Sequence, residues 1–565
     1  MNCNKFIKTP FSLGDAYKLS HWCQYPKGTT GVYSNLTPRK SRRPGIDQFV
    51  FFGLQYWLKD LNSQFQENFF ELTEDQAVAN FDSFFTGFFG FSSPASNAEV
   101  RGLHKLGYLP VKIKALKEGS VIDHNIPPVT FRSTHKDFFW FSQWLETWCS
   151  TTIWKPATSA TTALYYRRIF EYYNKKTSDI DWIVDFQAHD FSMRGMSGVD
   201  DALASGAGHL LSFKGTDTCP ANDWVNYYYP GDDNGLIGTS VPATEHTIQT
   251  AFLPENTNDT DMCDFLYTEN TLSKYPNGII SQVCDGYDFW RFVEFILPKF
   301  RDQIMLRDGK FVIRPDSSPQ TPVEIIVGED IPTLHIEGEF TVDKLVDSAL
   351  DAWKKDMLLF GGTGPSNTIT CRCQGKYYFM EFTITMQDVV SCTKCEEVSL
   401  TYEQKGLVEC LYEIFGGTVN NKGYIDLDPH IGAIYGDSIT LEYAEKILSG
   451  LEKKGFSSNN IVLGVGSFTY QFVTRDTHGI AIKSTAVESD GHWRATYKDP
   501  KTDNSGKKSA KGFLSVDFVD GKYVLNQNVS EEEEAEGCLE LVYLDGVMKR
   551  QQSFNEVRTE LRKFI

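Results

Sequence analysis

Long apolar runs are missing from this sequence, and so is an excess of basic residues. No apolar stretch reaches the roughly 18 to 20 residues that a membrane-spanning helix needs, so we expect no membrane segment. The 55 lysines and arginines are outnumbered by 74 aspartates and glutamates, which gives a net charge of -19 at pH 7. A general nucleic-acid binder needs an accumulated positive surface. The charge excludes that class but is compatible with a local basic pocket for a small phosphorylated substrate.

The beginning of the sequence lacks the charged segment and apolar core of a secretory signal, and we expect no such signal. Cysteine is present, with 12 residues, but these are scattered through 565 positions. Such scatter in a large chain is a poor match for a disulfide framework. We therefore expect a cytoplasmic protein in a soluble, reducing compartment.

Apolar and aromatic side chains are abundant. The chain is 41% hydrophobic and 14% aromatic, with 41 Phe and 26 Tyr. This composition argues against disorder and supports a large buried core. The length predicts about two to four domains.

From residue 148 onward, short apolar runs alternate with helical stretches. Several runs end in acidic, basic or Gly-rich segments, as strands that carry functional side chains do. The alternative is that these are ordinary polar residues at strand ends. Repetition favours a parallel α/β barrel or open sheet, with its site at the carboxyl ends of the strands. The runs are WIVDF (182–186), which precedes His189 and Asp190, GIISQVCD (278–285), KFVIRPD (310–316), IGAIYGDS (431–438) and NIVLGVGS (460–467).

The segments outside this region have strand and helix patterns. The alternation in Val111–Leu116 predicts a strand, and residues 512–527 predict a hairpin that turns at Asp520 and Gly521. The stretch from Phe49 predicts a helix with one buried face. We interpret Glu531–Glu534 as a solvated loop and Ser553 as the cap of a final helix.

Residues 326–403 break the barrel rhythm and predict a small β-rich insertion. Four of its cysteines have the spacing C-x-C-x18-C-x2-C. Paired thiolates can hold a structural zinc ion, although the first pair has one spacer residue instead of the usual two. Four unrelated cysteines on a small β-hairpin are the alternative. The cysteines are Cys371, Cys373, Cys392 and Cys395.

The stretch TSVPATEHTIQT (239–250) places a histidine at the start of a helix. Pro242 ends an extended run, and Glu245 and His246 follow in a turn. Such a loop can aim an imidazole at a site, whereas a surface or packing role is the alternative.

Several unusual segments occur together and in one order, including GDAYKLSHWCQYP, VFFGLQYWL, HDFSMRG, FKGTDT, SVPATEHTI, VIRPDS and YGDSI. They resemble the nicotinamide phosphoribosyltransferases, type II enzymes of the nicotinate phosphoribosyltransferase-like family. The resemblance implies an α/β fold: an irregular parallel α/β barrel at 148–473, interrupted by the insertion, plus a β-rich α+β domain formed from 1–147 and 474–565. It also implies that nicotinamide attacks C1 of phosphoribosyl pyrophosphate in NAD salvage, in a homodimer with shared active sites.

The resemblance assigns the residues that hold nicotinamide. Phe191 would stack on the pyridine ring, Tyr17 of the other subunit would close the sandwich, and Arg194 would bond the carboxamide oxygen. Asp217 would accept a hydrogen bond from the amide NH₂ and would repel the carboxylate of nicotinate, so we expect nicotinamide as the substrate.

Ribose and phosphate contacts follow from the same resemblance. Val465, Ser467 and Phe468 replace parts of the family's triple-glycine turn. Ala481 stands where the family has a serine, and Gly432 stands where it has a basic residue. The implied ribose contacts are Arg314, Asp316, Gly436 and Asp437, and the implied 5′-phosphate contacts are Gly466 and Ser467. The implied phosphate, pyrophosphate or ATP contacts are Arg39, Arg475, Lys483, Lys498 and Lys507, of which Arg475 and Lys483 are expected from the partner subunit.

The resemblance also gives His246 a role, because its counterpart is transiently phosphorylated by ATP. Asp285 would orient the imidazole, Glu245 is a second nearby acid, and Asp316 completes the catalytic set. Pyrophosphate and ATP chemistry imply Mg²⁺, which is usually coordinated by substrate phosphates and several waters. A nicotinate phosphoribosyltransferase and a non-catalytic dimeric binding protein on the same fold are the alternatives. Asp217 argues against the first, and the retained site residues argue against the second.

Overall fold

The computed structural model describes residues 6–316, 320–332, 334, 336, 339–359, 368–374, 376–384, 389–436, 439–501 and 508–565. The chain divides into two compact units. The first unit comprises Met1–Arg168, His189–Ser240 and Val465–Ile565, and the second comprises Ile169–Ala188 and Val241–Gly464. The predicted domain boundaries at 147 and 473 stay a prediction, because units defined by contacts need not coincide with fold domains.

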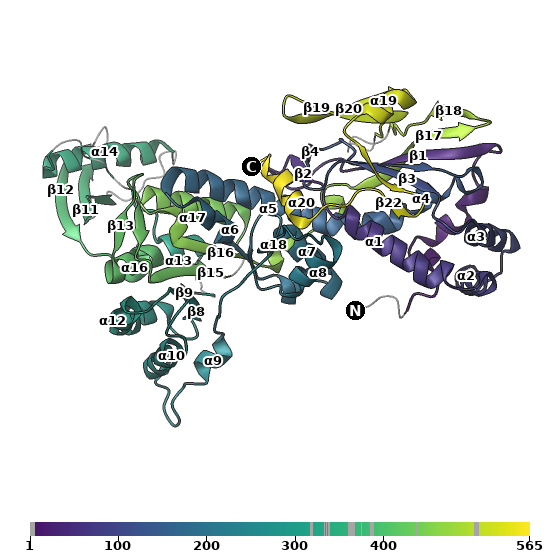
Figure 1. The fold of residues 1–565 in the computed structure, drawn as a ribbon. Coiled ribbons are helices and arrows are strands. Elements are labelled where there is room, and N and C mark those ends of the chain that lie inside the picture. Colours follow the sequence, from purple (N-terminus) through teal and green to yellow (C-terminus); the bar gives the residue numbers. More distant parts are fainter. Residues whose placement is uncertain are drawn as a thin grey trace. The chain divides into compact units, whose positions relative to one another are not determined.

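An antiparallel sheet forms the centre of the first unit, with the strand order β18-β17-β1-β5-β3-β21-β22. The N-terminal strand β1 pairs with β17, and β3 pairs with β21, so both chain ends build one sheet (Figure 1). This confirms the β-rich part that the sequence predicts from both ends. The strands are β1 (Thr29–Thr37), β3 (Val111–Ala115), β5 (Val129–Ser133), β17 (Ala481–Ser489), β18 (His492–Ala495), β21 (Glu540–Leu544) and β22 (Val547–Met548).

Aromatic side chains fill the core between this sheet and its helices. The ring of Phe11 lies 5.8 Å from that of Phe65, 5.7 Å from Phe69 and 5.2 Å from Trp144. Burial of such large apolar groups is a dominant stabilising contribution. The helices of this unit include α1 (Leu54–Phe65), α2 (Glu74–Phe89), α3 (Pro94–Leu106), α4 (Phe141–Trp144), α7 (Val199–His209), α8 (Pro220–Tyr228) and the beginning of α5 (Glu146–Thr177).

The C-terminal hairpin and the last helix have the predicted form. Strands β19 (Phe513–Val519) and β20 (Lys522–Val529) meet at Asp520 and Gly521, whose φ angles of 50° and 79° suit a two-residue turn. Ser553 caps α20 (Phe554–Arg562) by accepting a hydrogen bond from the Glu556 backbone.

Two local predictions are wrong, and a third, the helix in the stretch from Phe49, is confirmed only from Leu54 onward. The stretch from Phe49 first forms strand β2 (Gln48–Val50), which pairs with β4 (Val121–Asp123), and the helix starts only after Gly53, whose φ is 102°. Glu531–Glu534 belong to helix α19 (Glu531–Glu536), because Ser530 provides a capping box and acids favour a first turn. The run WIVDF forms a 3₁₀ turn (Asp181–Ile183) and helix α6 (Val184–Gln187). The expected strand begins only after this helix, at Ala188.

Parallel strands organise the second unit, in the order β16-β15-β9-β8. Together with the parallel pair β6–β7 of the first unit, they confirm the α/β class with parallel strands and intervening helices. Among the described residues, no helix is long and apolar enough to cross a membrane. The elements are β6 (Ala188–Asp190), β7 (Gly215–Thr216), β8 (Ile280–Val283), β9 (Phe311–Arg314), β15 (Ile431–Tyr435), β16 (Ile461–Val465), α10 (Thr260–Lys274), α16 (Leu407–Phe415) and α17 (Leu441–Lys453).

Within residues 326–403, three antiparallel strands have the order β10-β11-β12. The segment also contains an 18-residue helix, α14, which the expectation of a β-rich insertion did not include. Leu345 and Ala349 of α14 share a buried cluster with Met380 and Phe382 of β11. The elements are α14 (Val342–Leu359), β10 (Thr368–Cys373), β11 (Lys376–Ile384) and β12 (Val389–Val398), and residues 360–367, which include GGTGPS, lie outside the described residues.

A buried carboxylate joins this insertion to α16. The Tyr377 hydroxyl of β11 donates to Glu409 at 2.6 Å, and the Lys454 ammonium lies 3.2 Å from the same carboxylate. A third group, the guanidinium of Arg372 in β10, lies 3.7 Å away. The side chains of Glu409 and Lys454 are each 5% exposed.

Glu409→Ala is expected to lower the free energy of unfolding by about 3–5 kcal/mol, because it leaves buried cations without a counter-charge. Urea and thermal unfolding measure this loss. The matched control is Glu413→Ala on the same helix, which removes a 40%-exposed partner of Lys405 and should cost about 0–1 kcal/mol. Equal losses in the two variants would contradict the assignment.

Candidate active site

Strands β6 and β7 of the first unit place Phe191 and Asp217 at one edge. His189 pairs with Gly215 and Asp190 with Thr216, so Phe191 and Asp217 each follow directly after a strand. The Asp217 backbone N–H donates to the carbonyl oxygen of Asp190 at 2.9 Å. Parallel register therefore brings together two residues that are 26 positions apart in the sequence.

The carboxylate of Asp217 is held by two neighbouring side chains. Its Oδ1 lies 3.0 Å from Nε2 of His189 and also accepts a hydrogen bond from the Ser240 hydroxyl. The His189 ring in turn lies 4.5 Å from the ring of Phe191, tilted by 32°. An aromatic face thus adjoins an oriented hydrogen-bond acceptor. No role for His189 or Ser240 is predicted from the sequence, and only the position of His189 at a strand end could have indicated one.

The Gly466–Ser467 turn packs against the segment that carries Phe191 and Arg194. The Phe191 N–H donates to the Val465 carbonyl oxygen at 3.1 Å. A Cβ atom on Gly195 would lie 2.1 Å from the Ser467 hydroxyl oxygen, so only glycine permits this approach. Ser467 starts the short helix α18 (Ser467–Gln471). The predicted ring-stacking and 5′-phosphate positions therefore lie side by side.

Basic residues of the first unit line two hollows that share Arg39. One, of about 520 Å³, is lined by Lys40, Arg42 and Arg43 as well as Arg39. The other, of about 230 Å³, is lined by Arg39 and Lys483. The Arg39 Nε–H donates to the carbonyl oxygen of Gly479 at 2.8 Å, which restrains the guanidinium. These hollows suit polyanions.

The other predicted cations lie nearby in the sequence but have different surroundings. Arg475 pairs with Asp476 at 2.6 Å and is about half exposed. Lys498 is exposed, and its backbone N–H donates to Ser509. Lys507 lies outside the described residues.

Tyr17 projects from a short 3₁₀ helix (Ala16–Cys23) and is 59% exposed. Its hydroxyl donates to Asp15 at 3.1 Å. Burial raises the pKa of the phenol, and the Asp15 carboxylate raises it further, whereas the charge of Arg475 lowers it. The ring is therefore neutral near pH 7 and presents an apolar face.

His246 of the second unit begins α9 (His246–Thr250), as the sequence predicts for a turn-to-helix histidine. Its Nε2 lies 3.0 Å from Oδ1 of Asp285, and Oδ2 of Asp285 accepts the Asp316 backbone N–H at 2.8 Å. The Asp285 side chain is 2% exposed and that of His246 is 43% exposed. Glu245 is exposed at the N-cap and makes no side-chain capping bond. A buried carboxylate thus orients an accessible imidazole.

The ends of β9 and β15 meet beside this pair. Asp316 follows β9, and a Cβ atom on Gly436, which follows β15, would lie 2.7 Å from the Asp316 Oδ1 atom. The Arg314 guanidinium donates to the carbonyl oxygen of Thr244, two residues before His246. Strand-end polar residues are therefore brought together here, as the repeated pattern indicates. Asp437 lies outside the described residues.

The four predicted zinc ligands lie on one face of the insertion sheet. Cys371 and Cys373 are buried in the apolar cluster beneath α14, and Cys392 and Cys395 pack against it. Burial raises the pKa of the Cys371 thiol to about 12, and the neighbouring thiols add to this shift. No cluster of three or more metal-binding side chains is found among the described residues. Packing explains the positions of these cysteines, and zinc stays a prediction that elemental analysis tests.

Sequence comparison gives this arrangement a family context. Residues 186–348 and 382–551 match the sequence model of the nicotinate phosphoribosyltransferase (NAPRTase) family. The chain belongs to this family. Residues 11–92 also match the nicotinamide phosphoribosyltransferase N-terminal domain. Together the two matches include the segments that carry Tyr17, Asp217 and His246, and the family resemblance stated from the sequence is confirmed.

Three similar proteins carry the name nicotinamide phosphoribosyltransferase. The one from Acinetobacter baylyi is 37% identical and aligns over 98% of this chain and 97% of its own length. The one from Mycoplasma pneumoniae is 30% identical over 86% of this chain and 92% of its own. The one from Xanthomonas campestris pv. campestris is 28% identical over 96% of each. The alignments thus span nearly the whole of these proteins.

Proposed function

We propose that this family member is a nicotinamide phosphoribosyltransferase, which forms nicotinamide mononucleotide and pyrophosphate in NAD salvage. The single observation that carries the proposal is the carboxylate of Asp217, held by His189 beside the ring of Phe191. An aromatic face with an adjacent anionic acceptor fits a flat ring that bears a donor amide. It disfavours a ring that bears a carboxylate.

The chemistry needs positioning more than acid–base catalysis. The pyridine nitrogen of nicotinamide carries a lone pair, forms the bond to C1 of the ribose, and needs no base. The C1–oxygen bond breaks, and its electron pair leaves with pyrophosphate. Positive charge develops on the ribose and negative charge on the leaving group, so Arg39 and Lys483 would stabilise the departing phosphates. Phe191 and Asp217 would fix the attacking ring.

ATP coupling through His246 is a second part of the proposal. The contact between Asp285 and Nε2 holds the ring and leaves Nδ1 as the nucleophile toward the γ-phosphorus of ATP. An N–P bond would form while the bond to ADP breaks, and water would later cleave the phosphoimidazole. We propose that Mg²⁺ accompanies the substrate phosphates and keeps most of its water ligands.

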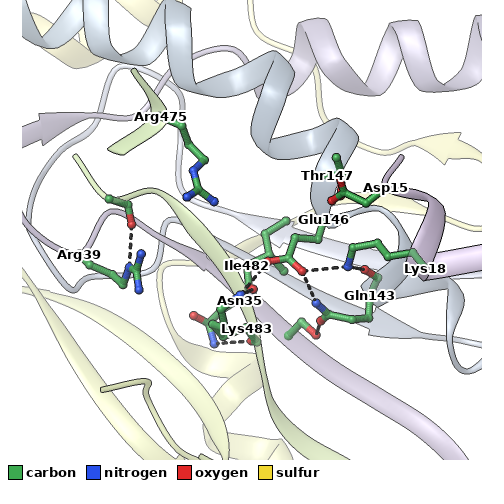
Figure 2. A network of polar contacts seen from close by, with 12 residues as sticks. Asp15, Lys18, Asn35, Arg39, Gln143, Glu146, Thr147, Arg475, Ile482 and Lys483 are labelled. Carbon is green, nitrogen blue, oxygen red and sulfur yellow. Dashed lines mark hydrogen bonds and ion pairs between the residues drawn. The ribbon is translucent and has the colours of Figure 1, made fainter. Parts of the chain in front are cut away.

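We also propose a cytoplasmic homodimer with shared sites. Support comes from Tyr17, an aromatic side chain left 59% exposed in a core-rich unit. Its short helix is linked through Lys18 and Glu146 to Lys483 (Figure 2). Tyr17 and Lys483, which the family resemblance expects one subunit to contribute to the site of the other, are therefore connected within the same unit.

Product identification tests this function. Purified protein is incubated with phosphoribosyl pyrophosphate and either nicotinamide or nicotinate, with and without ATP and Mg²⁺. Nicotinamide mononucleotide is the expected product, with a higher rate when ATP is present. Equal or better use of nicotinate would overturn the proposed substrate, and no transfer to either base would overturn the activity.

A further inference from the structure

The beginning of α5 gathers polar side chains around Glu146 (Figure 2). Lys18 donates to Oε2 of Glu146 at 2.9 Å, and Lys483 donates to Oε1 at 2.8 Å. Gln143 donates to Oε2 at 2.8 Å. Figure 2 shows the two lysines approaching the carboxylate from different sides. One carboxylate therefore links the segment next to Tyr17 with strand β17.

The surroundings of the two lysines differ. Lys18 is only 3% exposed and also donates to the carbonyl oxygen of Gln143 at 3.0 Å. The Lys483 side chain is 40% exposed and lines the same hollow as Arg39. Burial alone would raise the pKa of Glu146, but the charges of Lys18 and Lys483 outweigh burial and hold that pKa below its usual value. Glu146 is therefore ionised near pH 7 and shared by a buried and an accessible cation.

Thr147, the residue after Glu146, anchors the segment on the N-terminal side of Tyr17. The Thr147 hydroxyl donates to Oδ2 of Asp15 at 2.6 Å, the atom that also accepts the Tyr17 hydroxyl. Tyr17 thus lies between two anchored residues, Asp15 and Lys18, and both anchors are side chains in the first turn of α5.

We propose that Glu146 is a positioning residue that couples phosphate binding at Lys483 to the ordering of Tyr17. The proposal rests on the proposed function, because it takes Lys483 as a phosphate contact and Tyr17 as a lid on the nicotinamide ring. Glu146 touches neither substrate and acts through the two lysines.

The coupling arises because the bound phosphate and the Glu146 carboxylate compete for the ammonium group of Lys483. A phosphate at Lys483 draws its ammonium away from Glu146, and the partly buried carboxylate is then left with Lys18 as its close cation. In a site of low dielectric this strengthens the contact between Lys18 and Glu146. Tighter anchoring of Lys18 restricts the adjacent Tyr17, so nicotinamide meets an ordered ring. Linkage requires the reverse effect of nicotinamide on phosphate affinity.

Titration calorimetry on the full-length protein measures this coupling without turnover. Nicotinamide is titrated into the protein with and without saturating inorganic pyrophosphate. We expect pyrophosphate to tighten nicotinamide binding about fivefold or more in the unmodified protein, the lower range of typical coupling between sites. Glu146→Gln keeps the shape of the side chain but removes its charge, and should reduce the effect to less than about twofold.

Two further variants keep the test decisive. Thr147→Val releases Asp15 but leaves Glu146 with both lysines, so it should weaken nicotinamide binding while keeping the response to pyrophosphate. Glu146→Asp retains the charge on a shorter side chain and should keep part of the response. If thermal unfolding shows that Glu146→Gln is misfolded, Glu146→Asp is used in its place, and its response to pyrophosphate should be smaller than that of the unmodified protein.

The outcomes separate this inference from the proposed function. The coupling would be overturned if pyrophosphate left the nicotinamide affinity of the unmodified protein unchanged. It would also be overturned if Glu146→Gln responded to pyrophosphate as the unmodified protein does. Both conclusions hold even if nicotinamide mononucleotide is formed. Coupling that depends on Glu146 in a protein that makes no nicotinamide mononucleotide would sustain the inference and overturn the activity. Steady-state kinetics add a second readout: Glu146→Gln should raise KM for both substrates and change kcat little.

Discussion

His246→Ala is expected to lose the stimulation by ATP completely while slow, ATP-independent synthesis of nicotinamide mononucleotide continues. In the proposed mechanism the phosphoryl group is accepted by the His246 imidazole, which is 43% exposed beside Asp285, and alanine offers no atom to accept it. In the same proposal the transfer to nicotinamide does not use this imidazole, because the ring nitrogen attacks without a base. Rate measurements with and without ATP separate the two activities.

Asp285→Asn should keep ATP binding but slow phosphorylation of His246 by about 10²-fold or more, since the amide neither fixes the tautomer nor stabilises the charged ring. Protein labelled from γ-³²P-ATP should carry acid-labile phosphate. The label should be absent in His246→Ala and accumulate slowly in Asp285→Asn.

The chain offers a matched control in another histidine–aspartate pair of the second unit. His430 Nδ1 lies 2.7 Å from Asp428, directly before β15, and so at the amino end of that strand. His430→Ala removes an equally paired imidazole from the same unit and should leave ATP stimulation intact. ATP stimulation that survives in His246→Ala would show that this histidine is not the phosphoacceptor.

Residue patterns predicted the elements where local chemistry decides the conformation. The hairpin at Asp520 and Gly521 and the cap at Ser553 depend on neighbouring residues alone, and both predictions are confirmed. Glu531–Glu534 form a helix because a capping serine outweighs the mutual repulsion of the acids. The run WIVDF contains no signal that separates a buried helical turn from a strand, which is why that prediction is wrong.

The placement of the site was predictable only in part. Parallel strands bring their carboxyl ends together, so the neighbourhood of Asp285, Asp316 and Gly436 follows from the pattern. The contact between Glu146 and Lys483 joins residues 337 positions apart through side chains alone. Neither position has a local pattern that marks such a contact, and long-range side-chain pairing leaves no periodic signal in the sequence.

Asp217→Asn is expected to lower the preference for nicotinamide over nicotinate by about 10²-fold, measured as the ratio of the two kcat/KM values. The proposed charge-assisted bond from the nicotinamide amide to Asp217 would become a neutral one, a loss of about 1–2 kcal/mol. Removal of the negative charge also relieves the repulsion of the nicotinate carboxylate, by an amount of similar size. The two effects act in opposite directions on the two substrates, so they add in the ratio.

The control for this variant is Asp223→Asn, which makes the same charge change at an exposed position in α8. Its preference should match that of the unmodified protein. If Asp217→Asn uses nicotinate no better and loses activity toward both bases equally, the carboxylate serves to hold His189 and Ser240 in place, and discrimination lies elsewhere in the ring pocket. A selective gain with nicotinate would instead show that the anionic charge next to Phe191 excludes the competing base.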